Sequence, residues 1–253
     1  MMNIVVFTDL DDCFLSTKRK FHKDTPLTTA AFDANGNPRS FASNKQLQML
    51  NILSASGAEI IPVTGRSHDV FNRVSLDILS KSWKVVSHGA YILDANGNAD
   101  KHWLEHQSAC YDLDGTALEI KHLNDVISTL IYESSFPARS YIVSEEGILC
   151  YLCVKCEEDT NYSEIFSHII KLVSSSAVDF RLHVNGRNLA LLPSYTDKAA
   201  AVKFIKERYF DEESLFISVG DSLTDLPFMQ TADFSISPTN SQIFDYFAGE
   251  KLI

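Results

Sequence analysis

The sequence predicts an α/β fold in which an antiparallel α+β segment interrupts a doubly wound parallel sheet. Through most of the chain, short apolar runs alternate with helical patterns, as in parallel strands buried on both faces. Between residues 92 and 186 the pattern becomes a helix followed by a hairpin, twice over. The length of 253 residues accommodates one domain with a second one inserted into it.

The predicted parallel strands are apolar runs of three to five residues, with a shorter one at 85–86. They lie at 4–7, 60–63, 85–86 and 215–219, with a weaker fifth at 234–236. Helices are predicted after Ser43, after Ser67 and over 197–209. Ser43 supplies an N-cap, and Gly57 ends the first helix.

The interrupting segment is predicted to be a cap domain. Its expected elements are helices at 117–132 and 162–173, and strands at 141–143, 148–154, 180–184 and 189–192. Asn185-Gly186 is a strong hairpin signal between the last two strands. We therefore expect residues 1–91 and 187–253 to form the core and residues 92–186 to form the cap. The pentapeptide Asp-Ala-Asn-Gly-Asn occurs at 33–37 and at 94–98, which predicts two similar hairpin turns.

Composition limits the classes of partner. The chain has 45% hydrophobic residues, so it is expected to fold, and its net charge is −11. A field of that sign repels a phosphate backbone, so we expect no nucleic-acid partner. Residues 92–186 hold 6 basic and 15 acidic residues, so most of the charge belongs to the predicted cap. This favours a compact substrate whose phosphate is its main charge.

Targeting signals are not recognisable. The first seven residues lack the basic flank and apolar stretch of a secretory signal, and no run approaches the ~18 apolar residues of a membrane span. We expect a cytoplasmic protein with no membrane partner.

Three of the five cysteines have the spacing Cys150-x-x-Cys153-x-x-Cys156. The surrounding residues favour a strand, in which Cys150 and Cys156 face one side and Cys153 the other. Three thiols arranged in this way do not converge on one ion. Reduced thiols are therefore favoured over a zinc or iron–sulfur site.

Acidic residues follow the first predicted strand, at Asp9, Asp11 and Asp12. Carboxyl ends of parallel strands line the ligand crevice of such sheets. Carboxylates crowded there repel one another unless a cation lies among them, and their oxygens suit Mg²⁺. The alternative is an acidic loop that is exposed to water or caps the next helix.

Three further segments lie at strand ends or at the start of a helix. They are Gly220-Asp221-Ser222-Leu223-Thr224-Asp225, Thr64-Gly65-Arg66, and Lys198. The Thr64 hydroxyl and the amides of its turn can hold an anion. Taken singly, each segment has an ordinary alternative: a capped turn, a loop or a solvated lysine.

Together these four segments resemble the haloacid dehalogenase-like superfamily, whose members are mostly Mg²⁺-dependent phosphatases with a Rossmann-like core. Asp9 and Asp11 match its Asp-x-Asp motif, Thr64 its hydroxyl motif and Lys198 its lysine. Asp221 and Asp225 match its Gly-Asp-x-x-x-Asp motif. The motifs stand in the family's order, and the resemblance covers nearly the whole chain.

Further features resemble the Cof-like and sucrose-phosphate-phosphatase-like branch, which has a large α+β cap. These are the Thr-Gly-Arg form of the second motif, the segment 87–92 and the long insertion. The chain departs from the usual pattern at Asp12-Cys13, where Gly-Thr is common. It also has Thr224 and His88 where Asn is usual.

The resemblance implies a mechanism. Asp9 is the expected nucleophile, and Asp11 the general acid and base. Mg²⁺ is expected to be held by Asp9, the Asp11 carbonyl and Asp221, while Asp225 positions metal waters or Lys198. Phosphoryl oxygens are expected to bind Thr64, Gly65 and Lys198.

The expected function is hydrolysis of a small phosphorylated metabolite, such as a sugar phosphate. A phosphomutase or phosphotransferase of the same fold and a non-catalytic binding module are the alternatives. Arg66 is a candidate substrate contact, with a salt bridge on the following helix as its alternative. Arg187 and Asn188 are candidates for reading the leaving group, or else surface residues. The sequence predicts neither the substrate's identity nor the oligomeric state.

Overall fold

The chain folds into two compact units. One comprises Met1–Trp103 with Lys198–Ile253, and the other Leu104–Asp197. The computed structural model describes residues 3–174, 176 and 178–249. Each unit has its own hydrophobic core. The assignment of a catalytic core and a cap, with boundaries at residues 92 and 186, stays a prediction.

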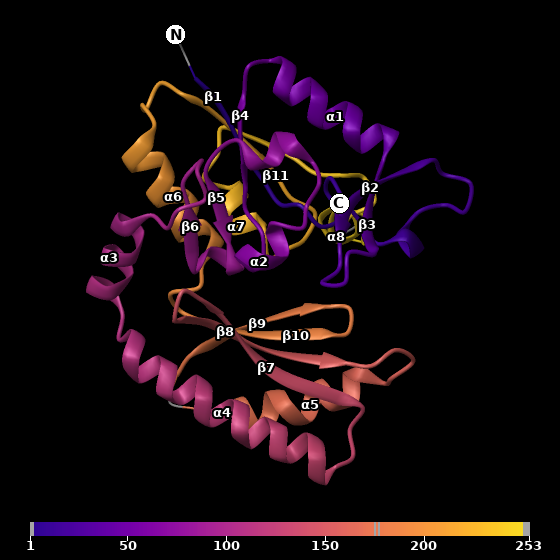
Figure 1. The fold of residues 1–253 in the computed structure, drawn as a ribbon, viewed down its shortest axis with the longest axis vertical. Coiled ribbons are helices and arrows are strands. Elements are labelled where there is room, and N and C mark those ends of the chain that lie inside the picture. Colours follow the sequence, from indigo (N-terminus) through magenta and orange to yellow (C-terminus); the bar gives the residue numbers. More distant parts are fainter. Residues whose placement is uncertain (1–2, 175, 177, 250–253) are drawn as a thin grey trace. The chain divides into compact units, whose positions relative to one another are not determined.

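A parallel sheet forms the centre of the first unit (Figure 1). Its strands are β1 (Ile4–Thr8), β4 (Glu59–Pro62), β11 (Leu215–Val219) and β12 (Phe234–Ile236). Their order is β12-β11-β1-β4, and all neighbours are parallel. Val5, Val6 and Phe7 of β1 are fully buried, as expected for a central strand covered on both faces. The predicted α/β fold class is confirmed.

One predicted strand pairs differently from the others. β5 (Lys84–Val86) is antiparallel to β6 (Tyr91–Leu93), and in the described part of the chain a single bridge, between Val63 and Val85, links it to the parallel strands. The tight turn η3 (Ser87–Gly89) reverses the chain directly after β5, so β5 becomes one arm of a hairpin.

Helices surround the sheet of the first unit. They are α1 (Asn44–Ala55), α2 (His68–Phe71), α6 (Lys198–Tyr209), α7 (Leu226–Met229) and α8 (Gln242–Gly249), with short 3₁₀ turns η1 (Lys18–Lys20) and η2 (Asp77–Ser80). α3 (Lys101–Cys110) runs from the first unit into the second. Ser43 and Gln46 form a capping box at the start of α1, as the predicted N-cap required.

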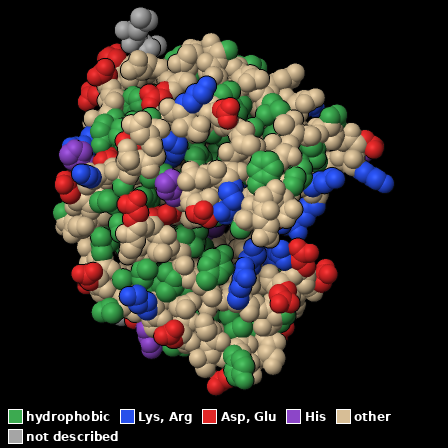
Figure 2. All heavy atoms as spheres, viewed as in Figure 1, with side chains coloured by type: hydrophobic (Ala, Val, Ile, Leu, Met, Phe, Trp, Pro, Cys, Tyr) green, Lys and Arg blue, Asp and Glu red, His purple; other side chains and the backbone are tan. Residues whose placement is uncertain are grey.

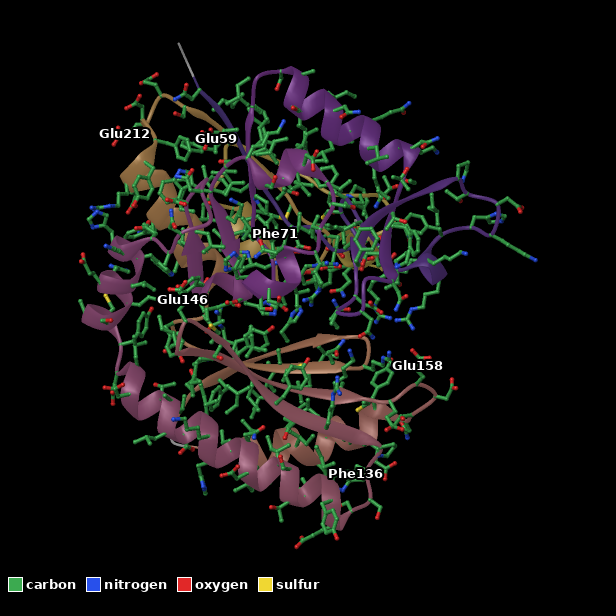
Figure 3. All side chains as sticks on the ribbon, viewed as in Figure 1. Glu59, Phe71, Phe136, Glu146, Glu158 and Glu212 are labelled. Atoms are coloured by element: carbon green, nitrogen blue, oxygen red, sulfur yellow. The ribbon has the colours of Figure 1, made fainter. Side chains whose placement is uncertain are left out.

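α2 is a single turn, shorter than the apolar pattern after Ser67 suggests. Phe71, labelled in Figure 3, is buried, and the helix ends there. Val74 does not extend the apolar side of the helix, because it forms a bridge with Ala31. The backbone amide of Phe32 donates to the Arg73 carbonyl across the same contact. Pairing with a distant strand therefore ends the helix early.

A hairpin of β2 (Leu27–Phe32) and β3 (Pro38–Ser43) was not among the predicted strands. The repeated pentapeptide forms its turn at 33–37 and a second turn at 94–98. In each turn the leading aspartate accepts two backbone N–H donors: Asn35 and Asn37 donate to Asp33, and Asn96 and Asn98 to Asp94. The prediction of two similar turns is confirmed.

The second unit is antiparallel. Its elements are α4 (Leu113–Glu133), β7 (Ala138–Glu145), β8 (Ile148–Cys156), α5 (Tyr162–Val173), β9 (Phe180–Asn185) and β10 (Asn188–Pro193). The strand order is β7-β8-β10-β9, and the apolar faces of α4 and α5 pack on one side of this sheet. The predicted repetition of helix and hairpin is confirmed.

Cys153 and Cys156 of β8 follow the alternation of a strand, whereas a bulge at Cys150 interrupts it, so the expectation that Cys150 faces the same side as Cys156 is not confirmed. Cys156 packs in the core beneath the helices, whereas Cys153 lies opposite Tyr141 and shares a hydrogen bond with its side chain. Burial raises the pKa of the Cys153 thiol. Within the described ranges, no helix is both long and apolar enough to cross a membrane.

Candidate active site

Three of the predicted motifs lie at the carboxyl ends of strands β1, β4 and β11. Asp9 follows β1, Asp221 follows β11 and Thr64 follows β4. β1 lies between β11 and β4, so the order of the strands in the sheet reverses at β1. Open α/β sheets bind ligands at such a reversal, beyond the carboxyl ends of the strands. The amide of Asp9 donates to the Val219 carbonyl over 2.8 Å, which places the first and last motifs side by side.

Lys198 joins two of the carboxylates. Its Nζ, at the start of α6, lies 2.7 Å from Oδ1 of Asp9 and 2.7 Å from Oδ1 of Asp225. Burial alone would lower the pKa of Lys198, but Asp225 and Asp9 outweigh it and raise the pKa. Lys198 therefore stays charged, and it compensates two buried acids at once.

The two acids differ in their surroundings. Burial raises the pKa of Asp9 well above its usual range, with Lys198 opposing. Burial acts in the same direction on Asp225, but Lys198 and Ser222 outweigh it and hold its pKa below the usual value. The hydroxyl and amide of Ser222 donate to Oδ2 of Asp225 over 2.7 and 3.1 Å. The Asp225 carboxylate is thus held in place by several hydrogen bonds, whereas the Asp9 carboxylate accepts fewer of them.

Gly220 explains how the segment after β11 packs so closely. A Cβ at this position would lie 2.5 Å from Sδ of Met229 and 2.8 Å from Cβ of Asp225. No side chain fits there without displacing Asp225. The hydroxyl of Thr224 lies 2.8 Å from that of Ser222, so it extends the hydrogen-bond chain that ends at Asp225.

Asp9, Cys13 and Asp221 form a buried group. One ligand atom from each of them lies within 4.8 Å of the others. Burial, then Asp225 and Asp12, raise the pKa of Asp221 to about 7. Among the described residues, no lysine or arginine forms an ion pair with Asp221. Two buried carboxylates without enough cationic charge fit a divalent cation, with Asp9 and Asp221 as ligands.

The turn that carries Cys13 depends on Asp12. Asp12 has a φ of 65°, in the left-handed region that aspartate tolerates better than most residues. Its amide donates to the Leu15 carbonyl over 2.7 Å, and its carboxylate pairs with Lys20. The departure from the usual Gly-Thr pattern therefore keeps a tight turn.

Asp11 is paired with Arg66. Nε and Nη2 of Arg66 donate to the two carboxylate oxygens of Asp11 over 2.8 and 2.7 Å, and Nη2 also donates to Ser40. The expected alternative for Arg66, a salt bridge on the following helix, is wrong, because Asp69 of α2 pairs with Arg73 instead. The bidentate geometry fixes the orientation of the Asp11 side chain. With its carboxylate paired to Arg66, Asp11 is predicted to offer a cation its backbone carbonyl.

Backbone hydrogen bonds from η3 hold the turn at 64–66 in place. Thr64 is fully buried, and its Oγ1 accepts from the Arg66 amide over 3.2 Å. The Ser87 amide donates to the Arg66 carbonyl, and the His88 amide to the Thr64 carbonyl. Ser87 and His88 have φ values of 49° and 57°, and strained backbone of this kind is concentrated at functional sites.

His88 also explains why residue 65 is a glycine. A Cβ on Gly65 would lie 2.3 Å from Cε1 of the His88 ring. The ring thus covers the backbone of the turn predicted to hold phosphate. Sequence reasoning noted His88 only as a departure from the family, and its contact with Gly65 was not predicted.

Arg187 and Asn188 lie in the second unit. Arg187 donates to Glu158 over 2.8 Å; Glu158 is labelled in Figure 3 on the loop after β8. Nδ2 of Asn188 donates to the Asn185 carbonyl across the hairpin turn. A role of either residue in substrate binding stays a prediction.

Solved structures share this fold at low sequence identity. A sucrose-phosphatase from Synechocystis sp. PCC6803, in complex with sucrose and phosphate, matches with a TM-score of 0.58 and 12% identity over 98% of both chains. A protein of Thermoplasma acidophilum matches with a TM-score of 0.57 and 16% identity, over 98% of this chain and 99% of that one. The C-terminal domain of a C. albicans trehalose-6-phosphate phosphatase matches with a TM-score of 0.58 and 15% identity, over 91% and 74%.

A family model adds a match in sequence. No curated protein matches the chain. The model of the sucrose-6F-phosphate phosphohydrolases matches residues 3–244, which include all the motifs above. The chain therefore belongs to the sucrose-6F-phosphate phosphohydrolase family, a branch of the haloacid dehalogenase-like phosphoric monoester hydrolases.

Proposed function

We propose that the protein is a Mg²⁺-dependent phosphatase that hydrolyses a small phosphorylated metabolite through an aspartyl-phosphate on Asp9. The observation that carries this proposal is the position of Asp9 at the end of β1, 2.7 Å from Lys198 and grouped with Asp221. A sugar phosphate is the substrate class that we propose, because the family is that of sucrose-6F-phosphate phosphohydrolases.

In the first step, a carboxylate oxygen of Asp9 attacks the phosphorus atom. The new bond joins that oxygen to phosphorus, and the bond between phosphorus and the leaving oxygen breaks. Asp11 gives a proton to the leaving oxygen, which departs as an alcohol. In the second step, Asp11 takes a proton from water, which attacks the phosphorus atom and frees Asp9.

Residues around Asp9 bind and orient the phosphoryl group. Lys198 neutralises the negative charge on its oxygens, and the Thr64 hydroxyl and Gly65 amide donate to them. Asp9, the Asp11 carbonyl and Asp221 would hold Mg²⁺, which when bound would further neutralise the charge of the transferring group. Because phosphoryl transfer depends mainly on positioning and charge, this set of residues is sufficient.

Arg66 orients the general acid and base. In its bidentate pair with Asp11, it holds the carboxylate over the turn that follows β1. Asp11 must carry a proton before the first step, so the pair must loosen when substrate arrives. The phosphate of the substrate competes for the guanidinium, and this competition links binding to protonation of Asp11.

The test is phosphate release from p-nitrophenyl phosphate, acetyl phosphate and a panel of sugar phosphates, with Mg²⁺ or with a chelator. We expect release that requires Mg²⁺ and needs no acceptor sugar, whereas a phosphomutase or phosphotransferase would need an acceptor. Asp9→Asn should lower the rate by about 10³-fold or more. The matched control is Asp12→Asn, since Asn tolerates the left-handed backbone of residue 12. Release at the parent rate by Asp9→Asn would refute the assignment.

A further inference from the structure

The thiol of Cys13 lies inside the proposed cation site. Its Sγ is 3.9 Å from Oδ1 of Asp221, and Cys13 is only 5% exposed. Sγ belongs to the same group of ligand atoms, within 4.8 Å of one another, as the carboxylates of Asp9 and Asp221. A thiol at this point gives the site a soft donor beside two hard ones.

Asp221 supplies an independent observation. Its residue is 8% exposed, and the one hydrogen bond to its carboxylate among the described residues comes from the Cys13 thiol. Lys198 forms its ion pairs with Asp9 and Asp225 and not with Asp221. A positive charge beside a carboxylate buried to this extent would favour its ionised form.

Ligand type decides which cation binds best. Oxygen ligands suit Mg²⁺, whereas thiolate selects thiophilic ions such as Zn²⁺ and Cd²⁺. The three donors lie on the turn after β1 and the loop after β11, and adjacent, hydrogen-bonded strands hold these together. The donors are therefore positioned before any ion arrives.

We propose that Cys13 joins Asp9 and Asp221 as a sulfur ligand of a thiophilic divalent cation, which competes with Mg²⁺ at this centre. On binding, the S–H bond of Cys13 breaks, the proton passes to solvent, and a sulfur–metal bond forms without any change of oxidation state. With Mg²⁺ the thiol keeps its proton and remains hydrogen-bonded to Asp221. The inference rests on the cation site of the proposed function.

The test is titration of the protein with Cd²⁺, followed by the ultraviolet charge-transfer absorption of a cadmium–thiolate bond and by calorimetry. Wild type should show the band, and Cys13→Thr should lose it. The affinity for Cd²⁺ should fall by about 10–100-fold, and that for Mg²⁺ should change much less. Cys110→Ser, which removes an exposed thiol, is the matched control and should keep the band.

A band that persists in Cys13→Thr, or an equal loss of Cd²⁺ and Mg²⁺ affinity, would overturn the inference. Cys13→Ser covers the case in which threonine disturbs the packing; it should also lose the band while circular dichroism stays that of wild type.

Failure of this inference can be distinguished from failure of the proposed function. Mg²⁺-dependent phosphate release by wild type without a cadmium band removes only the sulfur ligand. A band without release from any ester removes only the phosphatase assignment.

Discussion

Lys198 lies between two buried carboxylates of the candidate site. It bonds to Asp9 and Asp225, and its side chain is largely buried. A buried pair of this kind contributes little net stability relative to an apolar replacement of both partners, yet removal of one partner is costly. Lys198 therefore compensates the charge of both acids, and its predicted role as a phosphate ligand would come in addition.

The first prediction concerns that charge. Lys198→Met leaves the buried carboxylates of Asp9 and Asp225 without their cationic partner. We therefore expect the free energy of unfolding to fall by ~3–5 kcal/mol. Urea unfolding in the absence of divalent cations measures this free energy. Lys203→Met, at an exposed position of α6, is the control and should change stability by less than ~0.5 kcal/mol. Equal stability of the two variants would contradict the role given to Lys198.

Gly65 and His88 give a second prediction. Gly65→Ala places a methyl group against the His88 ring, so the ring or the turn at 64–66 must shift, and kcat/KM should fall by about 10-fold or more. In His88→Ala the ring is absent, and the additional change Gly65→Ala should then cost much less. A double-mutant cycle on kcat/KM should show coupling of ~1 kcal/mol or more. Additive effects would show that the ring does not constrain the turn.

At the residue scale, the sequence allowed prediction of the motif residues because each stands directly after an apolar strand or at a helix start. The structure brings Asp9, Asp221, Asp225 and Lys198 together. Their chemical roles stay predictions. The Arg66–Asp11 pair could not be foreseen, because its members are 55 residues apart and each had a plausible local partner.

At the scale of elements, the strands were easier to predict than their partners. All five apolar runs are strands, but β5 pairs with β6 because the turn at Ser87–Gly89 reverses the chain. α2 ends after one turn because Val74 pairs with Ala31, which is a long-range contact. The hairpin β2–β3 was missed because its strands mix small and polar residues and lack a long apolar run, although Ala30, Ala31 and Ala42 are buried. Local patterns predict an element's type, and distant contacts decide its length and neighbours.

The Asp33 turn gives the prediction at this scale. The amide and side chain of Asn37, and then the Asn35 amide, hold the pKa of Asp33 below its usual value. A lowered pKa means that the turn stabilises the fold above the ordinary aspartate pKa of ~3.9, and that this contribution is lost as the pH falls through the folded value. Asp33→Ala should thus lower the melting temperature at pH ~7 and converge with wild type in acid.

Thermal unfolding by circular dichroism over a pH series measures this effect. Asp24→Ala, in the exposed loop before β2, is the control and should change the melting temperature at pH ~7 less than Asp33→Ala does. A constant difference between wild type and Asp33→Ala at all pH values would mean that the turn's hydrogen bonds do not depend on the carboxylate charge.

At the scale of the whole molecule, two cores were predicted from the change of pattern along the chain, and two compact units are present. The net charge of −11 is not gathered into one acidic face in the view of Figure 2, where acidic and basic side chains both occur over the surface. The absence of nucleic-acid and membrane partners and the cytoplasmic location stay predictions.

Separate cores predict separate responses to cavity mutations. Ile127→Ala in α4 and Ile205→Ala in α6 each remove a fully buried side chain, with an expected cost of ~2–5 kcal/mol. Ile127→Ala should reduce hydrogen-exchange protection within 104–197 and leave Mg²⁺ affinity unchanged. Ile205→Ala, in the unit that holds the site, should weaken Mg²⁺ binding. A loss of Mg²⁺ affinity in Ile127→Ala would show that the two cores are coupled.

The central claim is that Asp9 is the nucleophile. Its most direct test is an acid quench during turnover of a radiolabelled phosphate ester, followed by peptide mapping of the labelled protein. We predict label on the peptide that contains Asp9, sensitive to hydroxylamine as acyl phosphates are, absent from Asp9→Asn and longer-lived in Asp11→Asn. Turnover without label on Asp9, or label on another residue, would contradict the account.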